Sequence, residues 1–237
     1  MEISPLGDSA LLIRVVENFD AAPDDALAKV VRAKRVIESE QIGGVIELAP
    51  AYGTLAVFYD PARAVDSGAP SENPFAWIEQ QITRALTRDE NIADDLSSRP
   101  VVDIPVCYEQ EFGWDLDHVA RHAKLHWKEV VDLHCSVEYR VYCVGFTPGF
   151  PYLGGLPRQL ATPRKDAPRK EVPSGAVAIG GSQTGIYPVK SPGGWNVIGR
   201  TPLRLFDSQK NPPAFLQAGD RVRFRAITRE EFERSIL

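Results

Sequence analysis

The sequence has few cysteines, no long apolar run and no recognisable export signal. No apolar stretch in its 237 residues approaches the roughly 18 consecutive residues that span a bilayer. Residues 1–15 lack the basic start, apolar segment and cleavage site of a signal peptide. The three cysteines, Cys107, Cys135 and Cys143, form no C-x-x-C pair, which favours free thiols over disulfides. We therefore expect a cytoplasmic protein without a membrane partner. A catalytic thiol is the less favoured alternative, because each cysteine adjoins an apolar run.

Several motifs of nucleotide, acyl-transfer and metal chemistry are also absent. The chain has no G-x-x-x-x-G-K-[ST] loop for ATP, no G-x-S-x-G elbow and no H-E-x-x-H motif. His118, His122 and His126 recur at four-residue steps, a spacing that could ligate a metal from one helix face. A break in the helical pattern before Trp127 argues against such a site. We predict no bound metal.

The most distinctive part of the chain is the segment from residue 145 to residue 204. It holds 11 of the 18 glycines and 9 of the 19 prolines, a composition that is usual in disordered chains. Aromatic residues and short apolar runs such as residues 176–179 are interleaved with the glycines, and disordered segments contain little of either. We therefore predict short strands joined by tight turns, with main chain that approaches a ligand closely.

The same segment is basic, whereas the rest of the chain is acidic. It carries eight basic and two acidic residues, in a chain of net charge −5 and pI of about 5.5. A basic, aromatic segment on an acidic protein favours a small anionic ligand. We expect no nucleic acid, because its binding needs a broader basic surface. The alternative is that these basic side chains form solvated ion pairs on strand faces.

The hydrophobic periodicity predicts an α+β fold that begins with a ferredoxin-like domain over residues 1–106. Helical patterns occur at residues 23–39 and 74–86. Strand patterns precede, separate and follow them, at residues 10–15, 45–48, 54–59 and 99–106. The resulting order, β-α-β-β-α-β, is that of the split βαβ arrangement.

The second predicted domain, residues 137–237, follows a helical connection at residues 107–136. Two helical patterns, at residues 115–125 and 127–134, make up that connection. The domain itself offers many short strands and turns, as a small closed β-barrel does. It ends in a helix at residues 229–236, which a capping box of Thr228 and Glu231 precedes.

Two arginines and one histidine are the candidate catalytic residues. Arg164 and Arg169 each follow a proline, which fixes the backbone that enters the arginine. A rigidly held guanidinium binds a carboxylate or a phosphate through two parallel hydrogen bonds. The alternative is a salt bridge to Asp166, Glu171 or the N-terminal domain. His134 could carry a proton, and its alternative is a hydrogen-bonded core histidine.

The candidate substrate-binding residues lie on turns of the glycine-rich segment. Short polar side chains beside glycines can orient a ligand, and an indole that follows two glycines lies beside bare main chain. We predict that the substrate is bound by Ser174, Gln183, Thr184, Tyr187, Trp195 and Asn196. The alternatives are ordinary turn chemistry for the polar residues and structural burial for the tryptophan.

Four stretches of the sequence resemble one known family. They are GFTPGFPYLGGLP, PRKDAPRKEVPSGAVAIGG, QTGIYP and SPGGWNVIGRTPLRLFD. The stretch PLGDSALLI and residues 105–108 are similar too, so the likeness covers essentially the whole chain. The chain is identified as a member of the family of 5-oxoprolinase B subunits, also called KipI-like or allophanate hydrolase subunit 1. The resemblance implies a ferredoxin-like N-terminal domain and a cyclophilin-like β-barrel that carries the glycine-rich motifs.

The resemblance also implies a function, as one component of an ATP-dependent enzyme that cleaves 5-oxo-L-proline to L-glutamate. The implied partners are the C subunit, which is KipA-like and is also called allophanate hydrolase subunit 2, and the A subunit. ATP is expected to be bound with one of these partners, and the ligand of this chain to be a small anionic amide. Two alternatives stay open. One is a KipI-type inhibitor that binds a sensor histidine kinase, and the other is a component of urea-amide metabolism similar to half of the urea carboxylase carboxyltransferase domain. We do not expect independent allophanate hydrolysis, because the chain has no Ser–Ser–Lys amidase stretch.

Overall fold

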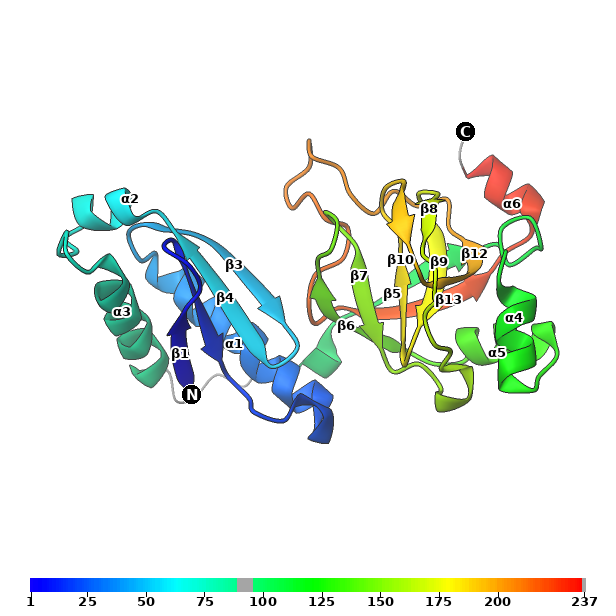
Figure 1. The fold of residues 1–237 in the computed structure, drawn as a ribbon, viewed down its shortest axis with the longest axis horizontal. Helices are drawn as coiled ribbons and strands as arrows, with labels where there is room; N and C mark the ends of the chain where they lie inside the picture. Colours follow the sequence, from blue (N-terminus) through cyan, green and yellow to red (C-terminus); the bar gives the residue numbers. More distant parts are fainter. Residues whose placement is uncertain (89–95, 236–237) are drawn as a thin grey trace. The chain divides into compact units, whose positions relative to one another are not determined.

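The computed structural model describes residues 1–88 and 96–235, which form two compact units (Figure 1). The first unit is Met1–Ser98 and the second is Arg99–Leu237. Both units combine helices with mostly antiparallel strands, so the predicted α+β class is confirmed. Within the described ranges, no helix is long and apolar enough to cross a membrane.

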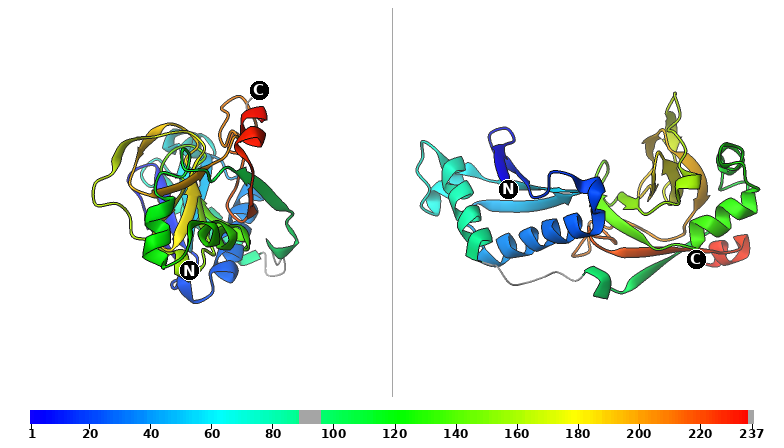
Figure 2. Two further views of the ribbon diagram at one scale, coloured as in Figure 1. Left: turned by 90° about the vertical axis from the view of Figure 1, so that its right-hand side faces the viewer. Right: turned by 90° about the horizontal axis from the view of Figure 1, so that it is seen from below.

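The first unit is an antiparallel sheet with helices packed against it (Figure 2). Its strands follow the spatial order β1-β2-β4-β3 and are β1 (Glu2–Pro5), β2 (Ala10–Arg14), β3 (Val45–Ala51) and β4 (Thr54–Tyr59). Its helices are η1 (Phe19–Ala21), α1 (Pro23–Glu40), α2 (Pro61–Asp66), α3 (Pro74–Arg88) and η2 (Leu96–Ser98). Helices α1 and α3 contact each other, and α1 also contacts β3 and β4. These contacts form because each helix buries an apolar stripe that recurs every three or four residues.

The last strand of the predicted ferredoxin-like order belongs to the second unit. The strand expected at residues 99–106 forms as β5 (Val101–Val106), but it pairs in parallel with β13 (Arg221–Ala226). The edge beside β2 is occupied by β1, because a turn that contains Gly7 at a φ of 70° folds the chain back onto β2. The units therefore divide after residue 98, whereas the expected first domain extends to residue 106.

The second unit contains one main sheet, a separate two-stranded ladder and several short helices. The main sheet has the order β5-β13-β6-β7-β10-β9-β12, and the ladder joins β8 to β11. The further strands are β6 (Tyr139–Val144), β7 (Pro151–Gly154), β8 (Arg169–Val172), β9 (Ala176–Gly180), β10 (Gln183–Ile186), β11 (Ser191–Gly193) and β12 (Asn196–Arg200). The helices are α4 (Leu116–Ala123), α5 (Trp127–Cys135), η3 (Arg158–Leu160) and α6 (Arg229–Arg234).

The helices of the second unit agree closely with the sequence pattern. Helices α4 and α5 form where the sequence predicts the connection, but their apolar faces are part of the core of this unit. The capping box of Thr228 and Glu231 opens α6 as predicted. The end of that predicted helix, at residue 236, lies outside the described residues.

The closed barrel expected for the second unit is not confirmed. Among the described residues no ladder joins β12 to β5, and the contact is a single bridge between Cys107, which follows β5, and Arg200 of β12. The two N–H···O distances of this bridge are 2.8 and 2.9 Å. A Cβ on Gly199 would lie 2.7 Å from the side chain of Val106, so the approach of the strands depends on a glycine. On its other edge β12 pairs with β9, in a ladder that changes register between Val197 and Gly199.

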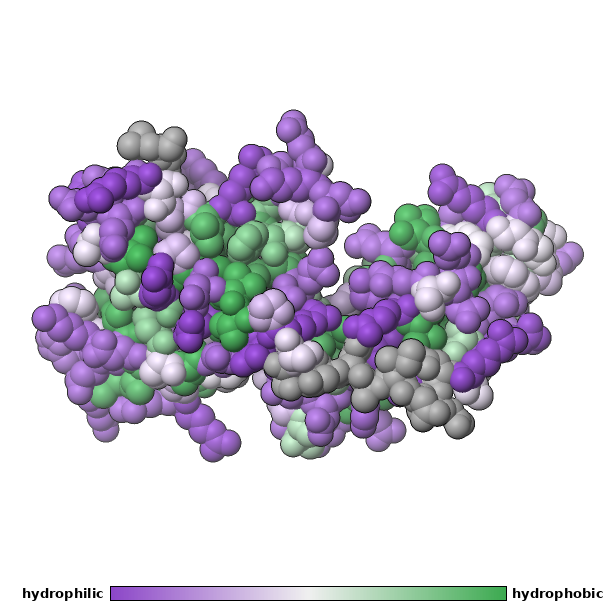
Figure 3. All heavy atoms as spheres, turned by 180° about the vertical axis from the view of Figure 1, so that it is seen from behind, coloured by the Kyte–Doolittle hydropathy of each residue, from purple (hydrophilic) through white to green (hydrophobic). Residues whose placement is uncertain are grey.

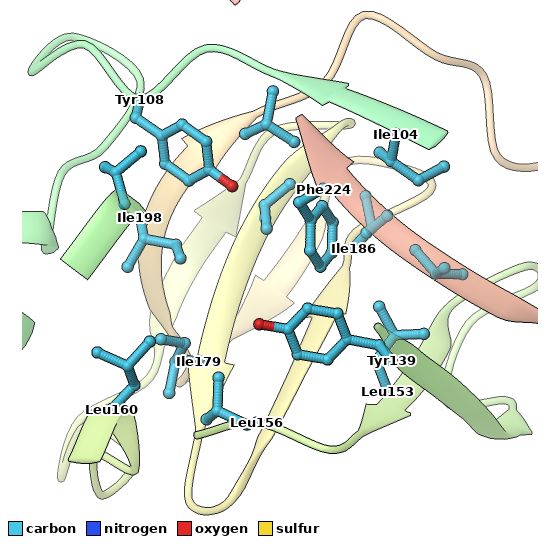
Figure 4. Close-up of a cluster of buried hydrophobic side chains, with 14 of the residues drawn as sticks. Ile104, Tyr108, Tyr139, Leu153, Leu156, Leu160, Ile179, Ile186, Ile198 and Phe224 are labelled. Atoms are coloured by element: carbon cyan, nitrogen blue, oxygen red, sulfur yellow. The ribbon is translucent and has the colours of Figure 1, made fainter. Parts of the chain in front are cut away.

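The core of the second unit is a cluster of aliphatic and aromatic side chains from its sheet, α4 and α5. Figure 4 shows Tyr108, Tyr139 and Phe224 pointing into this cluster, beside isoleucines of the strands and leucines of β7, η3 and the segment between them. On the face seen in Figure 3, hydrophobic side chains appear between hydrophilic ones over this unit. Trp114, Trp127 and Phe146 are large hydrophobic residues that remain exposed, so this unit does not bury all of its aromatic surface.

Candidate functional site

A cavity of about 300 Å³ lies in the second unit and is built from the glycine- and proline-rich segment. Its walls contain five aromatic rings, those of Phe146, Phe150, Tyr152, Tyr187 and Trp195. The other lining residues are Arg164, Lys165, Pro168, Pro192, Gly193 and Gly194. The predicted combination of aromatic planes, basic side chains and bare main chain is therefore present in one place.

The aromatic rings of the cavity pack edge to face around Phe150. The centroid of Phe150 lies 4.9 Å from that of Tyr152, 5.2 Å from Tyr187 and 5.5 Å from Trp195. Such contacts stabilise aromatic pairs because a positive ring edge faces a negative ring face. Phe150 is buried, whereas Phe146 is exposed and lies 5.8 Å from it. The cavity thus has a rigid aromatic wall and one exposed ring.

Two glycines make room for the aromatic wall. A Cβ on Gly193 would overlap the hydroxyl group of Tyr187, and a Cβ on Gly180 would lie 2.5 Å from the indole of Trp195. Neither glycine has a positive φ, so the requirement at both positions is close approach and not a special backbone conformation. The glycines of this segment therefore set the position of the two rings.

Burial raises the pKa of Tyr187 and of Tyr152. A hydrogen bond with the main chain of Trp195 partly opposes the rise at Tyr187, and the charge of Arg164 partly opposes it at both. Both phenols are therefore protonated at neutral pH and can donate a hydrogen bond. Both residues line the cavity, so each phenol is a candidate hydrogen-bond donor there.

Two basic residues, Arg164 and Lys165, line the cavity, and Lys165 is paired with Asp115. The guanidinium carbon of Arg164 lies 5.5 Å from the ring centroid of Trp195, which is a cation–π distance. Within the part of the chain that the structure describes, no carboxylate pairs with this exposed side chain. The main chain on both sides of Arg164 is held, because Asn196 donates to the carbonyl of Pro163 and the N–H of Lys165 donates to the carbonyl of Gly194, each at 2.8 Å. Arg164 is thus placed where an anion in the cavity could bind.

Arg169 occupies a different environment from Arg164. Its two terminal nitrogens donate to the carboxylate of Asp115 at 2.8 Å each, and its guanidinium carbon lies 5.5 Å from the ring centroid of Trp114. Arg169 does not line the cavity. The salt bridge considered as the alternative for this residue is therefore present, but with Asp115 as the acid. Asp115 escapes sequence reasoning because it looks like the ordinary acidic start of a helix.

His134 lies in the hydrophobic core and not at the cavity. It is fully buried, with Nδ1 2.8 Å from the hydroxyl of Tyr108 and Nε2 3.0 Å from the hydroxyl of Thr184. Thr184 donates to the carbonyl of Ala178, so it accepts from Nε2–H, and Nδ1 accepts from Tyr108. Burial lowers the pKa of His134 from 6.5 to about 3, which keeps the ring neutral. The structure thus places His134 as a hydrogen-bonded core histidine, which was the alternative to a proton carrier.

The polar residues predicted to bind substrate have structural contacts. The hydroxyl of Ser174 donates to the carbonyl of Pro188, on the far side of the β9–β10 hairpin, and Thr184 is fully buried beside His134. Asn196 is buried and ties Pro163 to its own strand. Gln183 begins β10 and does not line the cavity. Of the six predicted binding residues, the structure brings Tyr187 and Trp195 to the cavity, together with Arg164.

The described residues contain no group of three or more His, Cys, Asp and Glu side chains that could hold a metal ion. His126 of the predicted histidine series caps α5, since its Nδ1 accepts a hydrogen bond from the N–H of Lys128 at 3.3 Å.

The cysteines are free thiols, and burial raises the pKa of Cys107, Cys135 and Cys143. A thiol in that state is a poor nucleophile at neutral pH.

Comparison with known proteins agrees with the resemblance seen in the sequence motifs. Residues 1–216 match the family described as "Carboxyltransferase domain, subdomain C and D". The chain is 56% identical over 219 residues to the B subunit of 5-oxoprolinase from Escherichia coli O157:H7, covering 92% of this chain and 93% of that protein. It is 43% identical over 235 residues to the B subunit of 5-oxoprolinase from Bacillus subtilis (strain 168), covering 98% and 95%. The solved structure of TTHA0988 is similar at 36% identity with a TM-score of 0.72, and the match covers 92% of this chain and 40% of that chain.

The match over residues 1–216 defines the class: the chain belongs to the family described as carboxyltransferase domain, subdomains C and D. Two relatives that match over nearly their whole length, at 43% and 56% identity, are both B subunits of 5-oxoprolinase. The chain belongs to the family of 5-oxoprolinase B subunits.

Proposed function

We propose that this chain is the B subunit of an ATP-dependent 5-oxoprolinase, which cleaves 5-oxo-L-proline to L-glutamate together with the A and C subunits. The names and the identity of the two full-length relatives support the activity. The single structural observation that carries the proposal is the aromatic cavity with Arg164 at its wall. We propose further that this cavity binds the substrate.

The chemistry of the cavity suits a small cyclic amide that carries a carboxylate. A five-membered lactam ring is flat enough to lie against the indole of Trp195 and the phenol of Tyr187. Its carboxylate would pair with Arg164, whose guanidinium can form two parallel hydrogen bonds. A volume of about 300 Å³ is at the lower end of the roughly 300–1,000 Å³ found for ligand pockets. The size therefore favours a small substrate.

The residues of this cavity do not fit a nucleotide. A triphosphate needs several converging cationic or backbone N–H groups, as a P-loop provides. Here Lys165 is already paired with Asp115 at 2.8 Å, which leaves Arg164 as the basic side chain of the cavity without an acidic partner among the described residues. We therefore assign ATP to one of the partner proteins.

Reconstitution tests the proposed function. This chain is mixed with its A and C subunits, and 5-oxoproline-dependent release of ADP is measured. We expect no release when this chain is omitted; release at an unchanged rate without it would contradict the proposal.

The variant Arg164→Ala tests the proposed cavity in the same assay. Loss of a charge-assisted hydrogen bond costs about 1.5–3 kcal/mol, so kcat/KM should fall roughly 10- to 150-fold. The matched control is Arg158→Ala, which removes the same charge from an exposed arginine of η3 that does not line the cavity. Equal activity of the two variants would show that the cavity is not the substrate site.

The match to the carboxyltransferase family favours a second candidate function, transfer of a carboxyl group to a urea-like amide. That activity would require a biotin carrier. It is tested by replacing ATP and 5-oxoproline with a carboxylated biotin carrier and urea, and by following loss of the carboxyl group from the carrier. Transfer that depends on this chain would support the second candidate.

We propose further that the first unit is ferredoxin-like, that the second is cyclophilin-like, and that the protein is cytoplasmic. The elements β2, α1, β3, β4 and α3 follow the first five elements of a ferredoxin-like order, which supports that assignment for the first unit. The main sheet of the second unit, with its bridge between Cys107 and Arg200, supports a cyclophilin-like arrangement. Three free thiols support a reducing, cytoplasmic location.

A further inference from the structure

Asp115 forms the most highly connected ion-pair centre near the cavity. The residue is 4% exposed, and its two carboxylate oxygens accept four hydrogen bonds, all at 2.8 Å. The donors are Lys165, both terminal nitrogens of Arg169 and the backbone N–H of Val197. The N–H of Asp115 in turn donates to the carbonyl of Val197 at 2.7 Å. The carboxylate is therefore fixed to β12 and fully satisfied.

The charge of Asp115 is stable at neutral pH. Burial by itself would raise the pKa of this carboxyl, but the hydrogen bonds from Arg169 and Lys165 outweigh that effect and lower it. The pair with Arg169 is bidentate, the geometry in which a guanidinium and a carboxylate orient each other best. Asp115 thus works as a permanent anionic anchor.

Both cations that Asp115 binds, Lys165 and Arg169, belong to one short loop, residues 163–169. Lys165 directly follows Arg164, and Arg169 begins β8 at the end of the loop. The loop is also attached through main-chain atoms, by the bonds from Asn196 to Pro163 and from Lys165 to Gly194. Among the described residues, Arg164 is the charged side chain of this loop that lines the cavity without an ion pair.

We propose that Asp115 is a positioning residue for substrate binding: by holding Lys165 and Arg169, it fixes the loop at residues 163–169 so that Arg164 stands over Trp195 and meets the carboxylate of the substrate. This inference rests on the proposed function of the cavity. Asp115 itself touches no substrate, and it acts through Arg164.

Positioning and simple electrostatics predict opposite results when the charge of Asp115 is removed. The variant Asp115→Asn makes the surroundings of the cavity more positive, and attraction alone would then bind an anionic substrate more tightly and lower KM. If Asp115 positions the loop, the same variant raises KM, because a misplacement of about 1 Å can cost up to a hundredfold. The direction of the change in KM therefore separates the two explanations.

The test uses the reconstituted enzyme and measures kcat and KM for 5-oxoproline. We expect Asp115→Asn to raise KM about 10- to 100-fold while kcat changes much less. The second variant is Arg169→Lys, which keeps the positive charge but loses the bidentate pair with Asp115. It should also raise KM, by a smaller factor. This variant tests the proposal independently if Asp115→Asn does not fold. The matched control is Asp117→Asn, because Asp117 is an exposed carboxylate two residues further along in α4. Its KM should equal that of the unmodified enzyme.

A double-variant cycle shows whether Asp115 acts through Arg164. In an Arg164→Ala background, Asp115→Asn and Arg169→Lys should each change KM by less than about twofold, since coupled residues are not additive. Equal effects in both backgrounds would overturn the proposal, as would an unchanged or lower KM for Arg169→Lys and Asp115→Asn in the unmodified enzyme. An unchanged KM for Arg164→Ala alone would remove the proposed substrate site and this inference with it. A raised KM for Arg164→Ala with no effect at Asp115 and Arg169 would remove this inference alone.

Discussion

The buried histidine of the second unit should make the stability of that unit depend on pH. His134 has a pKa of about 3 in the folded protein, because burial disfavours the imidazolium, whereas an exposed histidine in the unfolded chain titrates near 6.5. Between these two values the unfolded state binds more protons than the folded state. The free energy of unfolding therefore falls as the pH falls through this window.

The size of this effect follows from the two pKa values. Each pH unit well inside the window costs up to about 1.4 kcal/mol, so that lowering the pH from about 7.5 to about 4.5 should cost roughly 2.6 kcal/mol from His134 alone. Asp115 adds little over this range, because its lowered pKa makes its own loss of stability appear only at more acidic pH. The range above pH 4.5 is therefore the one to measure.

The assay is urea unfolding at a series of pH values, for the unmodified chain and for His134→Gln. Glutamine does not titrate, yet its amide can accept from Tyr108 and donate to Thr184, as the imidazole does. Tryptophan fluorescence reports mainly on the second unit, because three of the four tryptophans lie there. The control variant is His118→Gln, at an exposed position of α4.

We expect His134→Gln to be less stable at neutral pH, because it loses the stacking contact with Phe224, but to lose much less stability on acidification. His118→Gln should keep the full pH dependence. Parallel loss of stability in the unmodified chain and in His134→Gln would refute the reasoning, since it would mean that His134 contributes no proton linkage.

Two further predictions concern the glycines and the thiols. Gly193→Ala should lower the free energy of unfolding in urea by about 1–3 kcal/mol, because the new methyl group overlaps the hydroxyl of Tyr187. The control Gly194→Ala should change it far less, because a Cβ at this position has no neighbour closer than 3.6 Å. Equal losses in the two variants would contradict the packing argument. Iodoacetamide at neutral pH should modify all three cysteines slowly in the native chain and rapidly in the urea-unfolded chain, because burial raises the pKa of each thiol in the fold. Mass spectrometry locates the modified residues. Fast modification of the native chain would show a reactive thiol and contradict the prediction.

The sequence predicts those features of this protein that depend on neighbouring residues. The capping box before α6 and the helical patterns of α4 and α5 are local, and they form where expected. The glycine-rich segment likewise predicts close approach of main chain and aromatic rings, because a glycine has no Cβ to keep a ring away. Trp195 and Tyr187, together with Arg164 after its proline, are predicted for one site from the sequence, and the three line the same cavity.

The features that sequence reasoning misses depend on partners far away along the chain. A period-two pattern shows that residues 101–106 form a strand, but not that β13, about 120 residues later, lies beside it. His134 is a core residue because Tyr108 and Thr184, 26 and 50 residues away, satisfy its two nitrogens. Asp115 gains its importance from Lys165 and Arg169, which are equally remote. No spacing rule within one segment contains that information.

The position of β13 between β5 and β6 has a consequence for synthesis on the ribosome. The ladders β1–β2, β2–β4 and β3–β4 of the first unit join residues 2–59, so these pairings can form early in translation. Strand β5 emerges soon afterwards, but its parallel partner is not made until residues 221–226 leave the exit tunnel. Throughout that interval β5 presents unpaired main-chain groups, the usual starting point for contacts between nascent chains. The second unit must therefore mature after translation has almost ended, and a nascent-chain binding protein would protect it best while residues 107–220 are being made.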